Sequence, residues 1–490
     1  MHILEALRAT AARTPGKLAI AYNGRAVSYG DFWRMICAAA GSLRPHLPER
    51  GLALIAVVDS LEGWILLLAL RALGLDTAVV RDGPQAALFQ GLAAACLVTL
   101  RGEHWPDLAA PAGVLRLEVT APSAASLPAE APPLEIADPP GDGAVLTSGT
   151  TGRPKIVLSR GRARTEILLE RNRRYEALGE GFSPMGEASV LAMLDFGLHT
   201  AAGQSQPMFV WALGGAVVMQ QGQDFQTALA WPGLTHALAT PWALIRLVRL
   251  PEDAFPFRPD LQLTIIAGAV TPSLIRQVQA RLTPRILVNL SSTEAGGWAR
   301  TIVRTDEDLT WYQLDPSRRV EVVDDAGRPL GPGQLGRVRV ARRDDGERRY
   351  IGGDGGAGAI FDGGWFYPGD LGVLDGRGRL ALHGRDSDVI HIDGDKYPAG
   401  PWEQAIQDRL GCAGVCLLSG RFQGEAETLH LFIQPAGPIT ADALQQTLQE
   451  TLSGFPSVHV HRVDSLPRTS MGKVRRFVLA QALHEGRLHL

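Results

Sequence analysis

The sequence predicts an α/β protein. A large N-terminal domain would combine layered α/β subdomains with a β-hairpin-rich subdomain, and a small α+β C-terminal domain would follow it. Three observations support this prediction. The chain has 490 residues, too many for one hydrophobic core. Short apolar runs alternate with helical patterns through its first 380 residues, which favours mainly parallel sheets. From residue 315 onward, Gly- and Pro-rich turns separate short strands.

The helices and strands are each predicted from a local pattern in the sequence. The N-terminal stretch 1–17 is typical of a capped helix and not of a signal peptide, because no basic leader precedes an apolar core. The most apolar run, 63–75, is too short to span a bilayer and contains Arg71, so we expect a buried helix. Helical patterns cover 31–43 and 271–282. Buried strands are predicted at 52–58, 77–80, 96–100, 215–220, 263–268 and 285–290.

The domain boundary follows from composition and pattern. Residues 121–143 are rich in Pro, Ala and Gly and predict a surface connection, whereas 318–343 predict hairpins. The last hundred residues have a strand–helix–strand–strand–helix pattern and then a tail, a length that suits a domain. We therefore predict an N-terminal domain at 1–384 and a C-terminal domain at 385–490.

Bulk composition excludes some partners. Net charge is −3, from 48 basic and 51 acidic residues, so nothing indicates binding to nucleic acid or to an anionic membrane. The four cysteines form no disulfide framework. Cys412 and Cys416 lack a second pair or a nearby His cluster, so we interpret them as small apolar residues. Without a targeting or membrane segment, a cytoplasmic location is the default expectation.

The string TSGTTGRPK predicts a phosphate-binding loop. It differs from the common phosphate loop because two residues separate its second Gly from Lys155. Gly without a Cβ lets the backbone approach a ligand, and consecutive N–H groups form an anion nest. A polar surface turn is the alternative, but the full string favours a nucleotide loop. Its candidate residues are Thr147, Ser148, Gly149, Thr150, Thr151, Gly152 and Lys155.

This string resembles the signature loop of the adenylate-forming superfamily, which includes acyl- and aryl-CoA synthetases, luciferases and the adenylation domains of peptide synthetases. Further similarities recur in order along nearly the whole chain. NLSSTEAGG (289–297) resembles a second family motif. The resemblance implies that Thr293 contacts phosphate and that Glu294 holds Mg²⁺, a hard cation that prefers oxygen ligands. Leu290 stands where the family has an aromatic residue. Alone, the S-T-E string would be an ordinary helix cap.

The other motifs complete the implied nucleotide site. IIAGAVTP is similar to the family's turn beside adenine, which implies that Gly268 and Ala269 lie against the base. FYPGDLG resembles the segment whose carboxylate, here Asp370, accepts the ribose hydroxyls. By the same resemblance Arg385 contacts ribose and phosphate. Taken singly, these strings are also typical of strand ends and turns.

The C-terminal motifs imply movement and catalysis. Ser387 falls where the family has its hinge, about which the C-terminal domain rotates between two half-reactions. LPRTSMGKVRR resembles the element whose lysine, here Lys473, touches both the carboxylate and the α-phosphate. His199 has the spacing of a residue that shapes the acyl pocket in CoA ligases, although such a His is as often a core residue. Trp211, Trp242 and Trp298 are candidates for an aromatic lining, or for the core.

Two departures from the family pattern concern the substrates. Residues 393–403 are one residue short of the CoA-ligase loop, Gly400 replaces its first Glu, and Glu403 is out of step. This puts the acceptor in doubt more than the adenylation. The stretch 199–207 offers no Asp to hold an α-amino group, so a plain acyl or aryl acid is expected.

The resemblance implies an ATP- and Mg²⁺-dependent enzyme that adenylates a small carboxylic acid, releases pyrophosphate and passes the acyl group to a thiol. CoA is the first expectation for that thiol, with the phosphopantetheine of a carrier protein close behind. Transfer to an amine or another non-thiol acceptor is the alternative within the family. A catalytically dead nucleotide-binding regulator and an unrelated kinase or NTPase are the rival classes.

Overall fold

The molecule consists of two compact units. The first comprises Met1–Ala239, Asp253–Leu263 and Arg343–Ala357, and the second comprises Thr240–Glu252, Thr264–Arg342 and Gly358–Leu490. The computed structural model describes residues 2–89, 92, 94–103, 105, 108, 114–147, 155–173, 182–222, 224–342, 348–351, 361–392, 395–420, 428–453, 455, 458–468 and 472–485.

The first unit contains a sheet whose core is parallel and whose edge is a hairpin. The parallel strands are joined in the order β7, β4, β3, β5 and β6, while β8 pairs antiparallel with β7, and β18 with β8. Their bounds are β3 Leu52–Ala56, β4 Asp76–Val79, β5 Ala94–Leu100, β6 Leu115–Val119, β7 Gly143–Thr147, β8 Lys155–Ser159 and β18 Arg348–Ile351.

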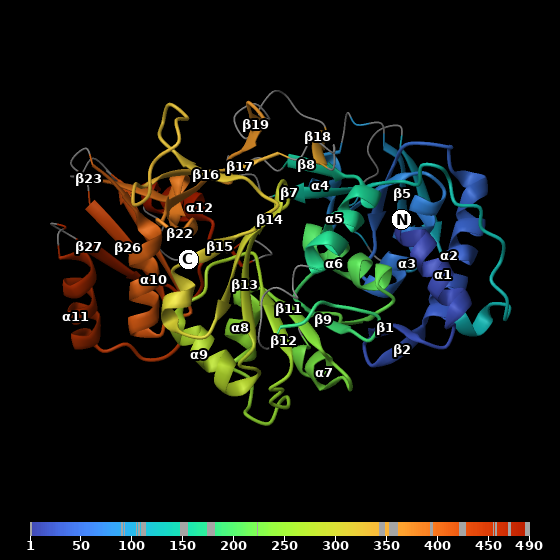
Figure 1. The fold of residues 1–490 in the computed structure, drawn as a ribbon, viewed down its shortest axis with the longest axis horizontal. Helices are drawn as coiled ribbons and strands as arrows, with labels where there is room; N and C mark the ends of the chain where they lie inside the picture. The colour runs from blue at the N-terminus through green and yellow to red at the C-terminus, as the bar shows by residue number, and fades with distance from the viewer. Residues whose placement is uncertain are drawn as a thin grey trace. The chain divides into compact units, whose positions relative to one another are not determined.

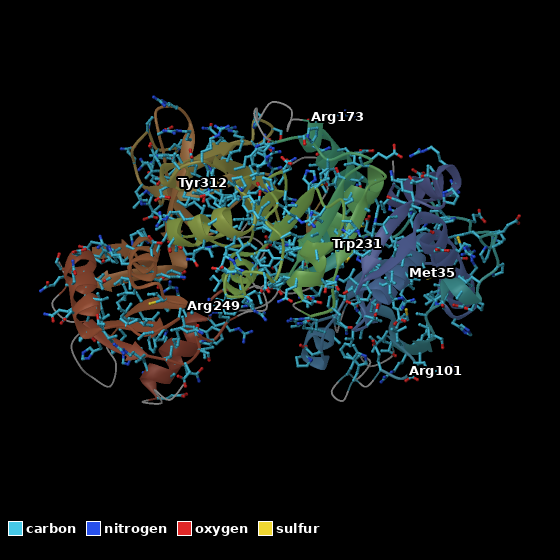
Figure 2. All side chains as sticks on the ribbon, turned by 90° about the horizontal axis from the view of Figure 1, so that it is seen from below. Met35, Arg101, Arg173, Trp231, Arg249 and Tyr312 are labelled. Atoms are coloured by element: carbon cyan, nitrogen blue, oxygen red, sulfur yellow. The ribbon has the colours of Figure 1, made fainter. Side chains whose placement is uncertain are left out.

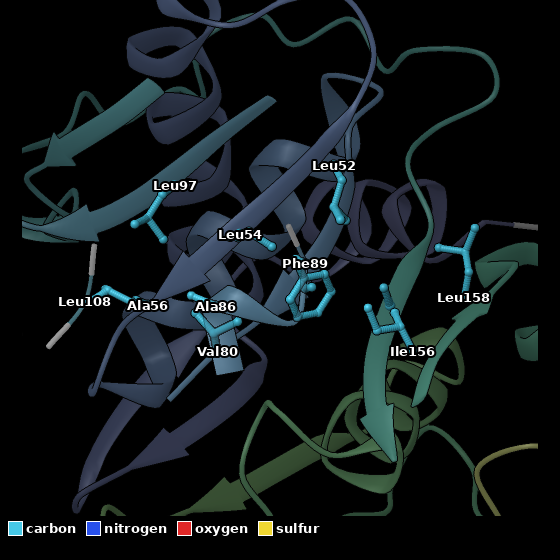
Figure 3. Packing of buried hydrophobic residues seen from close by; sticks show 12 residues of the cluster. Leu52, Leu54, Ala56, Val80, Ala86, Phe89, Leu97, Leu108, Ile156 and Leu158 are labelled. Atoms are coloured by element: carbon cyan, nitrogen blue, oxygen red, sulfur yellow. The ribbon is translucent and has the colours of Figure 1, made fainter. Parts of the chain in front are cut away.

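A cluster of buried side chains joins this hairpin to the parallel strands. Figure 3 shows Phe89 with side chains from both parts of the sheet around it. Ile156 and Leu158 of β8 and Ala144 of β7 belong to the same cluster as Leu54 of β3. Because burying one such aliphatic side chain contributes about 1.5–3 kcal/mol, the two strands that flank the predicted phosphate loop are firmly anchored.

A second group of strands in the first unit runs in the order β2, β1, β10, β9 and β11. Figure 1 shows α1, α2 and α3 gathered near its N-terminal strands. Trp211 of α6 is fully buried against Trp64 of α3 and Phe32 of α2, and it therefore belongs to the core. The bounds are β1 Leu18–Tyr22, β2 Arg25–Ser28, β9 Val190–Leu194, β10 Ala216–Met219, β11 His236–Ala239, α1 Ile3–Arg13, α2 Tyr29–Leu43, α3 Ser60–Ala72, α4 Gly83–Ala87, α5 Gly161–Arg173, α6 Ala201–Ala212 and α7 Phe225–Ala230.

Caps and burial explain these helices. Ser28 accepts a hydrogen bond from the backbone N–H of Asp31 at the start of α2, and Asp59 caps α3 in the same way. The run 63–75 is the buried helix that the sequence predicted, with Arg71 only 2% exposed. Figure 2 shows Met35 of α2 within this unit, and Arg101, which is exposed, near its edge.

The second unit begins with an antiparallel meander. Strands follow the order β13, β14, β15, β22, β21 and β17, with β16 and β20 on β17 and β19 on β20. Strand β12, Gln262–Ile265, crosses the boundary between the units. The bounds are α8 Pro241–Leu247, α9 Pro272–Arg281, β13 Ile286–Ser292, β14 Gly296–Val303, β15 Tyr312–Leu314, β16 Val320–Val323, β17 Gly336–Ala341, β19 Phe361–Asp362, β20 Trp365–Phe366, β21 Asp370–Leu374 and β22 Arg379–Arg385.

The C-terminal part of the second unit has a core of its own. Ile390, Ile406 and Leu431 are buried in one cluster whose members all come from residues 390–460. Strands β25 and β26 pair antiparallel, and β27 pairs parallel with β26. The bounds are β23 Val389–Ile392, β24 Asp395–Pro398, α10 Ala399–Leu410, β25 Gly414–Gly420, β26 Thr428–Gln434, α11 Ala441–Leu452, β27 Val458–Arg462 and α12 Arg476–His484.

Most predicted elements are found, and the C-terminal tail is the main difference. Each of the six predicted strands overlaps a strand of the structure, and 318–343 contains the hairpin strands β16 and β17. The predicted tail instead forms β27 and α12, whose buried residues only tertiary packing reveals. The division into 1–384 and 385–490 stays a prediction. Over the described residues, no helix combines the length and apolar character needed to cross a lipid bilayer.

Candidate functional site

The two ends of the predicted phosphate loop face each other across a hairpin. Thr147 ends β7 and Lys155 begins β8, and the two are directly paired. The Thr147 hydroxyl is buried and has no hydrogen-bond partner among the described residues, which suits a donor waiting for a ligand oxygen. The Lys155 ammonium lies 5.4 Å from the centre of the Tyr350 ring. The predicted loop residues between them lie outside the described part of the chain: Ser148, Gly149, Thr150, Thr151 and Gly152.

A buried arginine supports the strand that leads into this loop, and sequence reasoning gave it no such role. Arg71 donates to the hydroxyl of Thr77, beside β7, at 2.8 Å and to the side-chain oxygen of Gln204 at 2.8 Å. Burial lowers its pKa to about 10, which still leaves it charged at neutral pH. The signal was a single charged residue inside the most apolar run of the chain.

His199 lies in the turn before α6, where Thr200 caps the helix. Burial, followed by the nearby charge of Arg81, lowers its pKa to about 4. The imidazole is therefore neutral at physiological pH. Its Nε2 is buried and has no hydrogen-bond partner among the residues that the structure describes. This geometry suits contact with an uncharged part of a substrate, and a proton-transfer role near pH 7 does not fit so low a pKa.

Thr293 and Glu294 lie in the second unit, in the tight turn between β13 and β14. The Ser292 hydroxyl accepts a hydrogen bond from the backbone N–H of Ala295 at 2.9 Å, and Gly296 follows with a φ of 73°. The S-T-E string is thus a hairpin turn and not a helix cap. The hairpin presents the Glu294 carboxylate at a strand end.

Asp370 and Arg385 form an ion pair at the ends of two neighbouring strands. They are direct partners across β21 and β22, and Arg385 Nε lies 2.9 Å from Asp370 Oδ1. Arg385 also donates to the Pro368 carbonyl. Burial raises the pKa of Asp370, an effect that the charges of Arg385 and Lys473 oppose. The antiparallel register therefore places both predicted ribose contacts at one point.

Lys473 joins this group from the far end of the chain. Lys473 is exposed as a residue, but desolvation of its ammonium among these groups and then the charge of Arg385 lower its pKa, while Asp370, Glu294 and Asp388 act in the opposite direction. The structure thus brings Lys473 together with three of the predicted site residues, Glu294, Asp370 and Arg385, which lie 88 to 179 positions earlier in the sequence. Sequence reasoning did not name Asp388 as a member of the site.

The predicted adenine turn lies in the same unit. Gly268 and Ala269 are exposed and lie in the bend between β12 and α9. Helix α9 begins as predicted, because Thr271 caps it by accepting from the Leu274 N–H and Pro272 occupies its first turn. The structure describes Thr147, Lys155 and His199 in the first unit and the other located site residues in the second.

A second, partly buried ion-pair network ties the hinge segment to the C-terminal part. Arg476 Nε lies 3.0 Å from Asp388, and its Nη2 contacts Glu403. Glu403 also accepts from the Leu417 N–H. The glutamate that is out of step with the CoA-ligase loop thus has a structural role. Ser387 lies between Asp386 and Asp388 in the 3-10 turn at this point.

A match to a family of known proteins shows which family this chain belongs to. Residues 7–344 match the family described as AMP-binding enzyme. The chain belongs to this family. Over 353 residues it is 28% identical to a CoA ligase of Rhodococcus jostii named for a bicyclic indenyl propanoyl group, a match that covers 69% of this chain and 64% of that ligase. The match thus spans less than two thirds of that relative.

Solved structures of the family share the fold. An anthranilate CoA ligase in complex with anthranoyl-AMP superposes with a TM-score of 0.81 at 14% identity, covering 99% of this chain and 98% of that one. An amide bond synthetase from Marinactinospora thermotolerans gives a TM-score of 0.76 at 20% identity, covering 98% and 99%. These similarities confirm the predicted α/β fold class, with its large N-terminal part and small C-terminal domain.

The donor set suits a nucleotide better than a metal ion alone. Over the described part of the chain, no cluster of three or more His, Cys, Asp or Glu residues could hold a metal. Glu294 instead shares its surroundings with Asp370, Arg385 and Lys473, and Mg²⁺ in nucleotide sites is commonly held by one or two carboxylates together with substrate phosphates. The Thr147 hydroxyl, which has no hydrogen-bond partner within the described part of the chain, is consistent with a phosphate ligand in the first unit.

Proposed function

We propose that this protein uses ATP to adenylate a small organic carboxylic acid, forming an acyl-AMP and releasing pyrophosphate. The observation that carries the proposal is the Asp370–Arg385 ion pair, with Lys473 near enough for its charge to interact with Asp370, Glu294 and Arg385. A lysine this far along the chain, set among carboxylates that suit ribose and metal, can neutralise charge at a reacting phosphate. Membership of the AMP-binding enzyme family supports the same reading.

The reaction needs no covalent enzyme nucleophile. A carboxylate oxygen attacks the α-phosphorus in line, and the bond to the pyrophosphate oxygen breaks as the new bond forms. The Lys473 ammonium aligns the carboxylate with the α-phosphate and stabilises the negative charge of the transition state. Asp370 accepts hydrogen bonds from the ribose hydroxyls while Arg385 holds its carboxylate in place. Thr147, Lys155 and the loop between them bind the β- and γ-phosphates.

Glu294 is the residue that would hold Mg²⁺, with Thr293 on the neighbouring phosphate. When bound, the ion would neutralise phosphate charge and orient the leaving pyrophosphate. Gly268 and Ala269 would lie along the adenine base. We also propose that the protein works in the cytoplasm.

The acceptor proposed first is the thiol of CoA. Glu403, which is out of step with the loop of CoA ligases, is buried in the pair with Arg476, and Gly400 packs tightly on Gly384. A Cβ on Gly400 would lie 3.1 Å from the Gly384 Cα, so the glutamate of the family pattern would require this contact to open. A carrier-protein phosphopantetheine, or an amine, would require the same adenylation and differs only in this second step.

The substrate proposed is a plain acyl or aryl acid. Neutral His199, buried and with an uncommitted Nε2 among the described residues, suits the uncharged body of such an acid. The related ligase is named for a ring-containing propanoyl group, which favours testing cyclic and aromatic acids first.

The deciding experiment is acid-dependent exchange of labelled pyrophosphate into ATP without CoA, across short, long-chain, aromatic and amino acids. Exchange with one class supports adenylation and identifies the substrate class. ATP binding without exchange for any acid would favour the catalytically dead regulator. Release of ADP instead of AMP during turnover would favour a kinase or NTPase.

A further inference from the structure

The backbone just before Lys473 lies directly against Trp242 of α8. Gly472 has a φ of 80°, and a Cβ at this position would lie 2.6 Å from the Trp242 Cβ and 2.9 Å from its Cγ. A contact that close leaves no room for any side chain. The backbone that leads into Lys473 is therefore held close to the Trp242 side chain.

Arg468 contacts both the Trp242 indole and the backbone at Gly472. Its guanidinium carbon lies 4.7 Å from the centre of the Trp242 ring, and its Nη1 donates to the Gly472 carbonyl at 2.8 Å. Its Nη2 donates to the Ala413 carbonyl at 3.3 Å, and Arg468 forms a β-bridge with Val474. Through its backbone and its side chain, Arg468 thus contacts Val474 and Gly472 on either side of Lys473, Ala413 just before β25, and the face of the indole.

Helix α8 is a firm base for this contact. Thr240 caps it by accepting from the Ala243 N–H at 3.0 Å, and Pro241 occupies the first turn. Pro241 also lies against Gly268, since a Cβ on that glycine would be 3.1 Å from the Pro241 Cγ. Two adjacent residues of one helix therefore contact the proposed adenine turn and the backbone that carries Lys473.

Further contacts hold the neighbouring helix α10 to the same part of the unit. Gln404 donates to the Val270 carbonyl at 2.9 Å, and Asp408 accepts from the Ser273 N–H at 2.8 Å. These bonds lie at the start of α9, next to the adenine turn. Several contacts among the described residues thus accompany the arrangement in which Lys473 lies near Asp370, and the indole packs directly on the backbone next to the lysine.

We propose that Trp242 is a positioning residue for Lys473, holding its ammonium in place for adenylation through Gly472 and Arg468. The inference rests on the proposed function. Because the contact exists when Lys473 lies beside Asp370 and Glu294, its energy supports the first half-reaction only. Transfer of a preformed acyl group to the thiol does not use Lys473 and does not require the indole.

The test compares Trp242→Leu, Trp242→Phe and a matched control. Trp311→Leu also removes an indole under an arginine, since Arg379 lies 5.3 Å from the Trp311 ring centre, but it contacts a different strand. Trp242→Leu should lower the maximal rate of pyrophosphate exchange by about tenfold, the loss expected for a contact of cation–π size. The KM for the acid should change little, Trp242→Phe should restore most of the rate, and Trp311→Leu should leave it unchanged.

A second readout does not depend on turnover. In the ligand-free protein, hydrogen exchange of the peptide that contains Gly472 and Lys473 should be faster in Trp242→Leu than in the wild type and in Trp311→Leu. Thioester formation from synthetic acyl-AMP and CoA should continue at the wild-type rate. If Trp242→Leu melts at a temperature similar to that of Trp311→Leu, general unfolding is excluded as the cause of faster hydrogen exchange in Trp242→Leu.

The outcomes separate the two proposals. One outcome is that no tested acid supports pyrophosphate exchange by the wild type, while Trp242→Leu speeds hydrogen exchange of the peptide with Lys473. That result would contradict adenylation and would leave only the physical contact, so the positioning role would be overturned. If the wild type is active and Trp242→Leu keeps both peptide protection and exchange rate, the inference alone fails. Equal loss of both half-reactions, or no rescue by Trp242→Phe, would also overturn it.

Discussion

Asp370 and Arg385 face each other across β21 and β22 with 2.9 Å between Oδ1 and Nε. Lys473 lies near enough for its charge to lower the pKa of that carboxyl against the effect of burial. A strand pair thus fixes the proposed ribose site, whereas the proposed catalytic lysine reaches it on a separate loop.

Lys473→Ala should reduce adenylation by about 100-fold or more, because a group that stabilises charge only in the transition state is removed. Conversion of synthetic acyl-AMP to the thioester should remain close to the wild-type rate. Pyrophosphate exchange measures the first step, and single-turnover thioester formation measures the second. Equal losses in both would show that Lys473 does not belong to the adenylating arrangement.

The pH dependence of adenylation should show the lowered pKa of Lys473. Below that pKa the ammonium is charged and supports the reaction, and activity is lost as pH rises through it. The alkaline decline should therefore begin below the ordinary lysine pKa of about 10.4. In Lys473→Arg the charge persists, so any remaining activity should show no decline in this range. An identical decline in both proteins would assign it to another group.

Arg476→Met should destabilise the C-terminal part of the molecule. Glu403 and Asp388, which are 14% and 25% exposed, would lose their partner, and the cost should lie below the about 3–5 kcal/mol of a fully buried unpaired charge. Burial already raises the pKa of Glu403, and loss of Arg476 would raise it further. The loss of stability should thus be largest above that pKa and shrink as acid protonates the carboxyl. Thermal unfolding at several pH values measures this effect.

The matched control for that experiment is Arg409→Met. Arg409 pairs with Glu450 on the surface, where the two side chains are 51% and 39% exposed, and such pairs contribute little. Its unfolding midpoint should stay at the wild-type value across the pH range. A similar fall of the unfolding midpoint in Arg476→Met and Arg409→Met would mean that the Arg476 network stabilises the protein no more than a surface ion pair does.

Ser387→Pro should make the two half-reactions diverge, because proline stiffens the 3-10 turn between Asp386 and Asp388. One domain orientation would be retained and the other hindered, so one rate should fall while the other persists. Separate assays of pyrophosphate exchange and thioester formation detect this. Wild-type rates in both would place the hinge elsewhere and weaken the predicted boundary at residue 385.

Three kinds of local signal can be interpreted without a structure: the periodicity of apolar residues, helix caps, and short family motifs. Thr271 and Pro272 predict the start of α9, and the apolar run at 63–75 predicts a buried helix. Both predictions succeed because they depend only on neighbours within a few residues. Lys473, Asp370 and Glu294 were identified through family resemblance, each in a short string. The tail beyond residue 457 was missed, because β27 and α12 depend on pairing with β26 and on a shared core.

The sequence by itself determined the α/β alternation, the caps, and the residue types that suit a nucleotide. Tertiary structure alone decided that Glu403 pairs with Arg476, that Arg71 bonds to Thr77 next to β7, and that Trp242 lies against Gly472 instead of in the core with Trp211. The physical reason is sequence distance. Trp242 and Gly472 are 230 positions apart, and a contact between them is set by how two elements pack, which no local pattern records.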